Sequence, residues 1–172
     1  MIDGSGPGGL RLAKTLSLVV PACLLAGAYG FQYVWAHLYP CEMCWWQRYA
    51  HFAAVAFALA AILGGSALPD RGRSLVWLAA LAILTSGGIA IYHAGVEARI
   101  FTGFTQCTSV STARNPADLL NDIMNAPLVR CDEIQWSLWG VTMAGWNAIF
   151  SCLSALAILW LSLRRSARLI AA

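Results

Sequence analysis

Four of the six cysteines in this sequence are placed where they could do redox chemistry. Cys41 and Cys44 form a C-x-x-C pair, and Cys107 and Cys131 follow later in the chain. Pairs of cysteines move two electrons by thiol–disulfide exchange, in which a thiolate attacks a disulfide sulfur. A C-x-x-C pair also occurs in zinc knuckles, so the motif alone does not decide between redox chemistry and metal binding.

The residues around the C-x-x-C pair favour redox chemistry. Cys44 stands at the start of an apolar run, where the free backbone N–H groups and the dipole of a helix stabilise an anion. Arg48 follows one helical turn later on the same face. Because both effects stabilise a thiolate, the sequence predicts a reactive pair.

Four long apolar runs are available to position these cysteines. Hydrophobic residues make up 59% of the 172 residues and charged residues 11%, whereas soluble domains have about 45–50% and about 25%. Each run is near the roughly 20 residues that cross the hydrocarbon layer of a bilayer. The sequence therefore predicts an all-α integral membrane protein, a four-transmembrane-helix bundle that forms a single domain over residues 1–172, with spans near 16–36, 49–67, 75–92 and 141–163.

Charged residues predict how this bundle is oriented, because Lys and Arg stay on the cytoplasmic side. Basic residues predominate at the N-terminus, in the second connection and at the C-terminus, which lie on one side of a bundle with four spans. They are Arg11, Lys14, Arg71, Arg73, Arg164, Arg165 and Arg168. Acidic residues outnumber basic ones in the outer loops, 37–48 and 94–140. We expect both termini in the cytoplasm, and this charge pattern gives no support for nucleic-acid binding.

This topology places the C-x-x-C pair and both later cysteines on the outer side, where disulfides persist if that side is a bacterial periplasm. Cys23 and Cys152 fall inside apolar runs, and we expect them to be packing residues. Structural zinc is disfavoured, because Cys107 and Cys131 are far apart and there is no second C-x-x-C. Two inert disulfides that cross-link the long loop remain an alternative.

Arg48 and His93 are candidate ligands of a quinone. Both lie near the outer end of an apolar run, and an ionisable residue at that depth is a functional-site hypothesis. A guanidinium and an imidazole both donate hydrogen bonds to carbonyl oxygens, so the two could hold a quinone ring against the aromatic residues of the outer rim. The alternatives are a lipid-phosphate anchor for Arg48 and, for His93, a polar interface residue paired with Glu97 one turn on.

The long outer loop contains one helical pattern. Asn115 as a cap, Pro116 at the first helical position and Asp118 in the first turn predict the start of a short helix. Its apolar residues share one face, so we expect it to lie on the membrane lipid surface. They are Leu119, Leu120, Ile123 and Met124.

Over roughly residues 14–163, the sequence resembles the DsbB family of disulfide-forming membrane oxidases. The features that carry the resemblance are the stretch PCEMCWWQR from Pro40 to Arg48, the four-span hydropathy, the Tyr92-His93 pair, the two cysteines of the second outer loop and the Trp-rich segment from Trp136 to Trp146. The resemblance implies a quinone-dependent oxidase of the bacterial inner membrane that re-oxidises a soluble periplasmic dithiol oxidase of thioredoxin fold. The quinone would be ubiquinone or menaquinone.

The resemblance also implies a role for each outer cysteine. Cys44 corresponds to the thiolate that meets the quinone ring, and Cys41 to the member of the pair that exchanges with the loop. Cys107 corresponds to the loop cysteine that the partner's reduced thiol attacks. Cys131 corresponds to the cysteine that passes the electrons on to Cys41.

Arg48 and His93 correspond to family positions that contact the quinone. Two other functions remain open. A quinone or epoxide reductase of the vitamin K type also joins a four-helix bundle to a C-x-x-C, although that family usually places the motif late in the bundle. A membrane adaptor with a loop stapled by Cys107 and Cys131 would need no chemistry, and it would keep its function after Cys44→Ser.

Overall fold

The computed structural model describes residues 7–103, 115–117, 120, 124 and 129–163, and this part of the chain is mostly helical. Its long helices are α1 (Pro7–Gly30), α2 (Glu42–Leu63), α3 (Arg73–Glu97) and α5 (Met143–Leu163). A wider helical turn, η1 (Phe31–Trp35), continues α1, and a short 3-10 turn, η2 (Gly65–Ala67), follows α2. Two short strands, β1 (Ser137–Leu138) and β2 (Val141–Thr142), precede α5.

Three stretches of helix are long and apolar enough to cross a membrane: Gly8–Trp35, Arg73–Glu97 and Met143–Leu163. The fourth expected span corresponds to α2, which is not in this set because polar residues in its first turns lower its hydropathy. α2 also begins at Glu42 rather than at residue 49, and α1 at Pro7 rather than at residue 16. Backbone hydrogen bonding continues through charged and polar residues that end an apolar run, so helices extend beyond the predicted spans.

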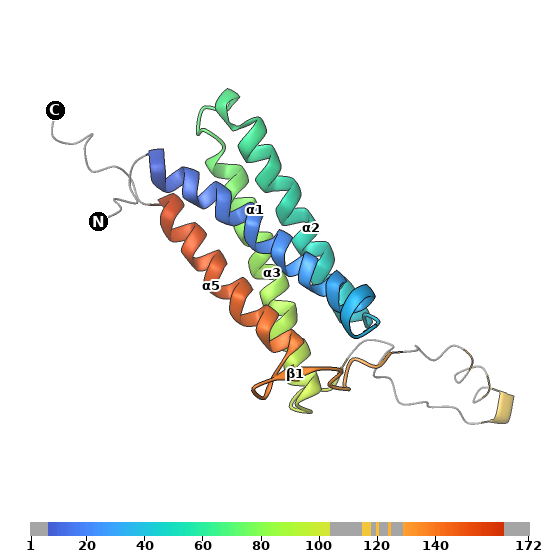
Figure 1. Cartoon of the computed structure of the whole chain (residues 1–172). Coiled ribbons are helices and arrows are strands. Elements are labelled where there is room, and N and C mark those ends of the chain that lie inside the picture. The colour runs from blue at the N-terminus through green and yellow to red at the C-terminus, as the bar shows by residue number, and fades with distance from the viewer. Residues whose placement is uncertain (1–6, 104–114, 118–119, 121–123, 125–128, 164–172) are drawn as a thin grey trace, which may run out of the picture.

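The long helices pack as a bundle in which α3 lies against α2 and α5, and α1 crosses the other side of these two helices (Figure 1). Much of the core is alanine, and small side chains let helix backbones approach closely in a membrane. The main buried cluster contains Ala13, Ala54, Ala61, Val76, Ala80, Ile83, Ala155, Ile158 and Leu161.

The α2–α3 turn lies at the same end of the bundle as the start of α1 and the end of α5 (Figure 1). Consistent with this arrangement, a Cβ atom added at Gly65 in that turn would lie 2.6 Å from Lys14 Nζ of α1. The α1–α2 connection and the β1–β2 hairpin lie at the opposite end. The C-x-x-C pair is therefore at the opposite end from the basic residues Lys14, Arg71 and Arg73.

The β1–β2 hairpin was not predicted, since residues up to 140 were expected to form a loop. Ser137 pairs with Thr142 and Leu138 with Val141. The two turn residues, Trp139 and Gly140, have φ angles of 52° and 78°. Two positive φ values suit the tight turn that joins antiparallel strands, but tryptophan is an uncommon residue there, so the sequence carries little turn signal. The short surface helix predicted from Asn115 falls largely outside the described residues.

α3 passes close to α5 at Gly87. A Cβ atom there would lie 2.8 Å from Cys152 Sγ and 3.2 Å from Ser151 Cβ, whereas the position of a Cβ at Gly88 is open. We expect Gly87→Val to destabilise the protein by about 1–3 kcal/mol through overpacking. Gly88→Val has the same effect on helix propensity without the clash. Thermal unfolding in detergent measures both, and equal losses would contradict the close approach.

Candidate active site

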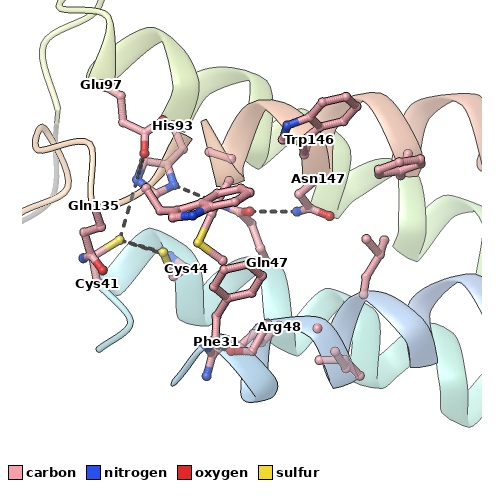
Figure 2. A pocket seen from close by; sticks show the side chains of 18 of the residues that line it. Phe31, Cys41, Cys44, Gln47, Arg48, His93, Glu97, Gln135, Trp146 and Asn147 are labelled. Carbon is pink, nitrogen blue, oxygen red and sulfur yellow. Dashed lines mark hydrogen bonds and ion pairs between the residues drawn. The ribbon is translucent and has the colours of Figure 1, made fainter. Parts of the chain in front are cut away.

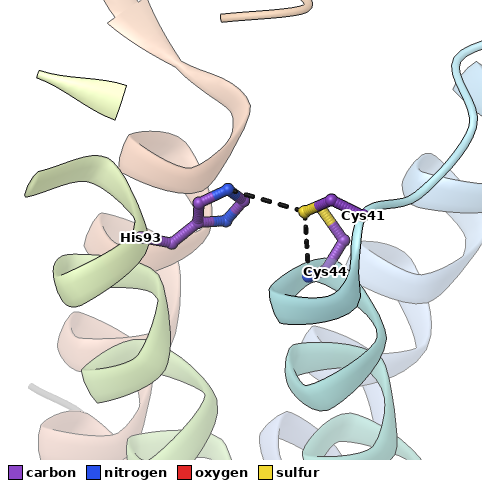
Figure 3. Close-up of side chains that lie close together, drawn as sticks. All are labelled: Cys41, Cys44 and His93. Atoms are coloured by element: carbon purple, nitrogen blue, oxygen red, sulfur yellow. Dashed lines mark hydrogen bonds between the residues drawn. The ribbon is translucent and has the colours of Figure 1, made fainter. Parts of the chain in front are cut away.

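Cys41 and Cys44 lie at the N-terminus of α2 (Figure 3). Cys41 is the N-cap residue and accepts a hydrogen bond from the Cys44 backbone N–H at 3.4 Å. The two residues are free thiols, and the Cys41 thiol donates to Cys44 Sγ at 3.0 Å. A disulfide bond is about 2.05 Å long. A movement of about 1 Å would therefore bring the two sulfurs to bonding distance.

Cys131 comes from the segment that precedes the hairpin and is fully buried in a cluster with Cys41. The two side chains are hydrogen-bonded. The pKa of the Cys41 thiol is raised by this hydrogen bond first, then by the hydrogen bond with Cys44 and by burial. Cys41 therefore holds its proton, and the structure places it in contact with both Cys44 and Cys131. The fourth predicted site cysteine, Cys107, lies outside the described residues.

His93 on α3 is buried and faces the cysteines (Figures 2 and 3). Its Nε2 atom lies 3.6 Å from Cys41 Sγ and 3.8 Å from Glu97 Oε1. The approach to Glu97 belongs to the alternative given for His93, a polar interface residue, but the ring is buried beside the cysteines. On the other side of the ring, Nδ1 is 3.0 Å from the Gln47 amide nitrogen. Because that amide donates to Nδ1, the ring proton is on Nε2 and points towards Cys41 and Glu97.

Arg48 lies one turn after Cys44 and is only 7% exposed. Its guanidinium donates to Gln32 Oε1 at 2.6 Å and to the Ala28 carbonyl at 3.5 Å. It also lies over the rings of Tyr29 and Trp45, at 4.7 and 5.2 Å. Both hydrogen-bond acceptors are uncharged, so the guanidinium keeps its attraction for an electron-rich ligand. Its burial by protein does not suit an anchor for lipid phosphate.

One cavity of about 470 Å³ joins these groups, and Cys41, Cys44, Arg48 and His93 all line it (Figure 2). Its volume is within the range of small-molecule sites, which is about 300–1,000 Å³. Five aromatic side chains form part of its wall: Phe31, Trp136, Trp139, Trp146 and Phe150. The arrangement can therefore hold a flat apolar ligand beside a thiol pair.

The two cysteines of the apolar runs differ in their surroundings. Cys23 is exposed and lines the cavity, so the prediction that it is a packing residue is wrong. Its position on α1 faces the cavity rather than a neighbouring helix. Cys152 is partly buried and lies next to Gly87, as a packing residue should.

Comparison with known proteins decides the family. The family model described as "Disulfide bond formation protein DsbB" matches residues 11–161. The chain belongs to the DsbB family. Together with its apolar helices, this membership makes it a membrane oxidoreductase of disulfide bond formation.

Relatives of this DsbB family member are similar over most of their length, and each is named Disulfide bond formation protein B. The protein of Verminephrobacter eiseniae (strain EF01-2) is 35% identical over 166 residues, which cover 89% of this chain and 84% of the relative. The protein of Paracidovorax citrulli (strain AAC00-1) is 31% identical over 165 residues, which cover 88% and 87%. No solved structure matches the chain.

A chain of buried polar side chains runs from the site of this DsbB family member into the bundle (Figure 2). Gln47 Oε1 accepts a hydrogen bond from Asn147 Nδ2 at 2.7 Å. Asn147 Oδ1 lies 3.0 Å from His51 Nε2 and accepts from Ser151 Oγ at 2.9 Å. Ser86 Oγ lies 2.9 Å from the same His51 nitrogen. These contacts fix the direction of the Gln47 amide, and hence the side of His93 that carries the proton.

Sequence reasoning missed three parts of this arrangement: Gln32, His51 and Asn147. Each is a polar residue within a largely apolar helix, and polar residues in that setting are rare and often functional. The spacing of Gln47 and His51, one helical turn apart, is a second available signal. Which partners they take depends on helix packing and is not visible in the sequence.

Asn147→Leu is expected to destabilise this DsbB family member by about 1–3 kcal/mol, because it leaves Gln47 Oε1 and other buried polar atoms without their partner. Thermal unfolding of the purified protein in detergent measures the loss. Ser154→Ala is the matched control in the same helix, since Ser154 Oγ donates to the backbone carbonyl of Ser151. A loss no greater than that of the control would show that the polar chain contributes little.

Proposed function

We propose that this protein is a quinone-dependent protein-thiol oxidase. It re-oxidises a soluble periplasmic dithiol oxidase of thioredoxin fold and passes the two electrons to a membrane quinone, either ubiquinone or menaquinone. The observation that carries the proposal is the single cavity lined by the C-x-x-C pair, Arg48 and His93. It combines a source of two electrons with two hydrogen-bond donors for carbonyl oxygens.

The residues of the cavity fit a quinone ring. The aromatic walls match a flat apolar ring, and the Trp146 indole N–H is buried without a hydrogen-bond partner among the described residues. A buried donor without a partner is costly, so a ligand carbonyl that accepts from it would stabilise the site. Arg48 offers a second, charged donor at the C-x-x-C side of the cavity.

The proposed chemistry is a relay of electron pairs through two disulfides. A reduced partner thiol attacks Cys107 of a Cys107–Cys131 disulfide, and the electron pair leaves on Cys131. Cys131 attacks Cys41 of the Cys41–Cys44 disulfide, which releases Cys44 as a thiolate. The partner's second thiol attacks its mixed disulfide with Cys107, which releases the oxidised partner and Cys107 as a thiolate. Cys107 then attacks Cys131 of the Cys41–Cys131 disulfide, which re-forms the Cys107–Cys131 disulfide and releases Cys41. Cys41 and Cys44 finally re-form their disulfide by giving two electrons and two protons to the quinone.

The contacts around Cys41 support this order. Cys41 is the sulfur that touches both Cys131 and Cys44. It also keeps its proton, since its pKa is raised by the hydrogen bond with Cys131 and by its other neighbours. Cys44 then remains as the hydrogen-bond acceptor at the N-terminus of a helix, where a thiolate is stabilised.

We further infer that α2 is the fourth transmembrane span and that the protein lies in the bacterial inner membrane with both termini in the cytoplasm. The basic residues Lys14, Arg71 and Arg73 belong to one end of the bundle, and the C-x-x-C pair, which lines the cavity, lies at the other. Under the positive-inside rule, this arrangement directs the thiol site to the periplasm.

The two alternatives fit these observations less well. The vitamin K type of reductase usually has its C-x-x-C late in the bundle, and here the motif begins α2. A stapled adaptor has no need for Arg48 and His93 beside a thiol pair in an aromatic cavity.

The test is quinone reduction by the purified protein in detergent. The protein receives a reduced thioredoxin-fold dithiol protein, and loss of quinone absorbance is followed for ubiquinone and menaquinone separately. Turnover that needs both the dithiol protein and the oxidase supports the proposal. No turnover with several such partners and both quinones would contradict it.

A further inference from the structure

Three metal-ligating atoms gather at the N-terminus of α2. Cys41 Sγ, Cys44 Sγ and one ring nitrogen of His93 all lie within 4.8 Å of one another (Figure 3). A fourth ligating side chain, Cys131, is fully buried in the same cluster as Cys41, but its sulfur does not lie within 4.8 Å of all three of these atoms and must move to complete a site. Three thiols and an imidazole are the donor set of a tetrahedral zinc site.

We propose that the fully reduced protein binds Zn²⁺ through Cys41, Cys44, Cys131 and His93, and that the bound ion prevents re-oxidation of the thiols. This inference goes beyond the proposed function and rests on the geometry of the ligands, not on a quinone. Binding is not a redox step: each of the three thiols releases one proton, and no electron moves.

The observed distances among three of the four ligands, Cys41, Cys44 and His93, are close to those of such a site. In a tetrahedron with Zn–S bonds of about 2.3 Å and Zn–N bonds of about 2.05 Å, neighbouring sulfurs are about 3.8 Å apart and sulfur and nitrogen about 3.6 Å. Cys41 Sγ and His93 Nε2 are 3.6 Å apart. The Cys41 and Cys44 sulfurs, at 3.0 Å, must separate by about 0.8 Å. Cys44 is only partly buried, which leaves it room to turn.

The surroundings of the cluster also suit an ion. Glu97 Oε1 lies 3.8 Å from the His93 nitrogen that would bind the metal, and Glu97 Oε2 has no hydrogen-bond partner among the described residues. This buried carboxylate adds negative charge beside the cation. On the other side of the ring, the Gln47 amide meets Nδ1 at 3.0 Å. When Nε2 binds the ion, Nδ1 carries the ring proton, so the Gln47 amide must turn over to accept it and loses the hydrogen bond from Asn147 Nδ2.

The site exists in one redox state of the protein only. The same sulfurs that would bind Zn²⁺ form disulfides in the proposed relay, and a disulfide is not a thiolate ligand. The ion therefore binds only the reduced protein, and its binding competes with oxidation of the thiols by the electron acceptor. Such a site makes the oxidase sensitive to free Zn²⁺ whenever reduced thiols accumulate.

The test uses the full-length protein in detergent, reduced with a phosphine and titrated with Co²⁺ as a spectroscopic substitute for Zn²⁺. We expect one Co²⁺ per protein with the visible absorption of a tetrahedral thiolate site, and loss of that absorption when Zn²⁺ is added. Cys41→Ser and His93→Ala should each weaken Co²⁺ binding by more than the roughly 10–100-fold typical of residues that only support a ligand.

The matched control is Cys152→Ser, which removes a thiol outside both the cluster and the cavity lining and should bind Co²⁺ like the original protein. The inference is overturned if the reduced protein shows no tetrahedral absorption, if the disulfide form binds equally well, or if Cys41→Ser leaves binding unchanged. Quinone reduction, measured separately with a chelator present, tests the proposed function. Normal turnover without Co²⁺ binding would overturn this inference alone, and Co²⁺ binding without turnover would support it while contradicting the oxidase.

Discussion

Cys44→Ser is expected to reduce the rate of quinone reduction by a factor on the order of 10³ or more, with the protein still folded. Cys44 receives the hydrogen bond of the Cys41 thiol and lines the aromatic cavity, so it is the sulfur placed to give electrons to a bound ring. Serine has a similar size but does not form a disulfide. The measurement is quinone absorbance under the conditions of the oxidase assay, with thermal unfolding as a check of the fold.

The same variant should also accumulate a specific intermediate. Without the Cys44 thiol, Cys41 has no partner within the C-x-x-C pair, and Cys131 is the cysteine that contacts it. A Cys41–Cys131 disulfide should therefore build up, and mass spectrometry of a non-reduced digest detects it. Cys152→Ser is the control, because that residue lies outside the cavity lining and packs near Gly87. Unchanged turnover in Cys44→Ser would favour the stapled adaptor.

The parts of the site that could be predicted from sequence are those set by local geometry. The approach of His93 to Glu97 follows from their spacing of one helical turn, and the place of Cys44 in the first turn of a helix follows from its position at the start of an apolar run. The start of α2 at Glu42 was less visible, because hydropathy marks where a chain is apolar and not where its backbone becomes helical.

The parts that could not be predicted join distant segments. The contact of Cys131 with Cys41 depends on how the segment before the hairpin folds over α2, and the resemblance suggested only a role for it. The bond from Arg48 to Gln32 depends on how α1 continues into η1 and on how that turn packs against α2. Neither contact corresponds to a recognisable spacing of residues in the sequence.

Arg48→Met is expected to raise the KM for quinone by about 10–100-fold, which corresponds to the loss of one hydrogen bond from a charged donor, about 1.5–3 kcal/mol. Methionine keeps the length and the apolar contacts of the side chain but removes the charge and all its donors. The effect should fall on KM more than on kcat if Arg48 holds the ring in the ground state as well as in the transition state. Initial rates at varied quinone concentration separate the two constants.

The stability of Arg48→Met must be measured together with its KM, because the substitution also leaves Gln32 Oε1 without its hydrogen-bond donor. Arg48→Lys helps here: it retains the charge but has one compact donor group in place of a planar fork, so quinone affinity should fall between those of the original protein and Arg48→Met. Arg71→Met removes a positive charge at the opposite end of the bundle and should leave the KM unchanged. If Arg48→Met folds normally and its KM equals that of Arg71→Met, the guanidinium does not contact the quinone. Quinone binding would then have to depend on His93 and the aromatic residues of the cavity alone.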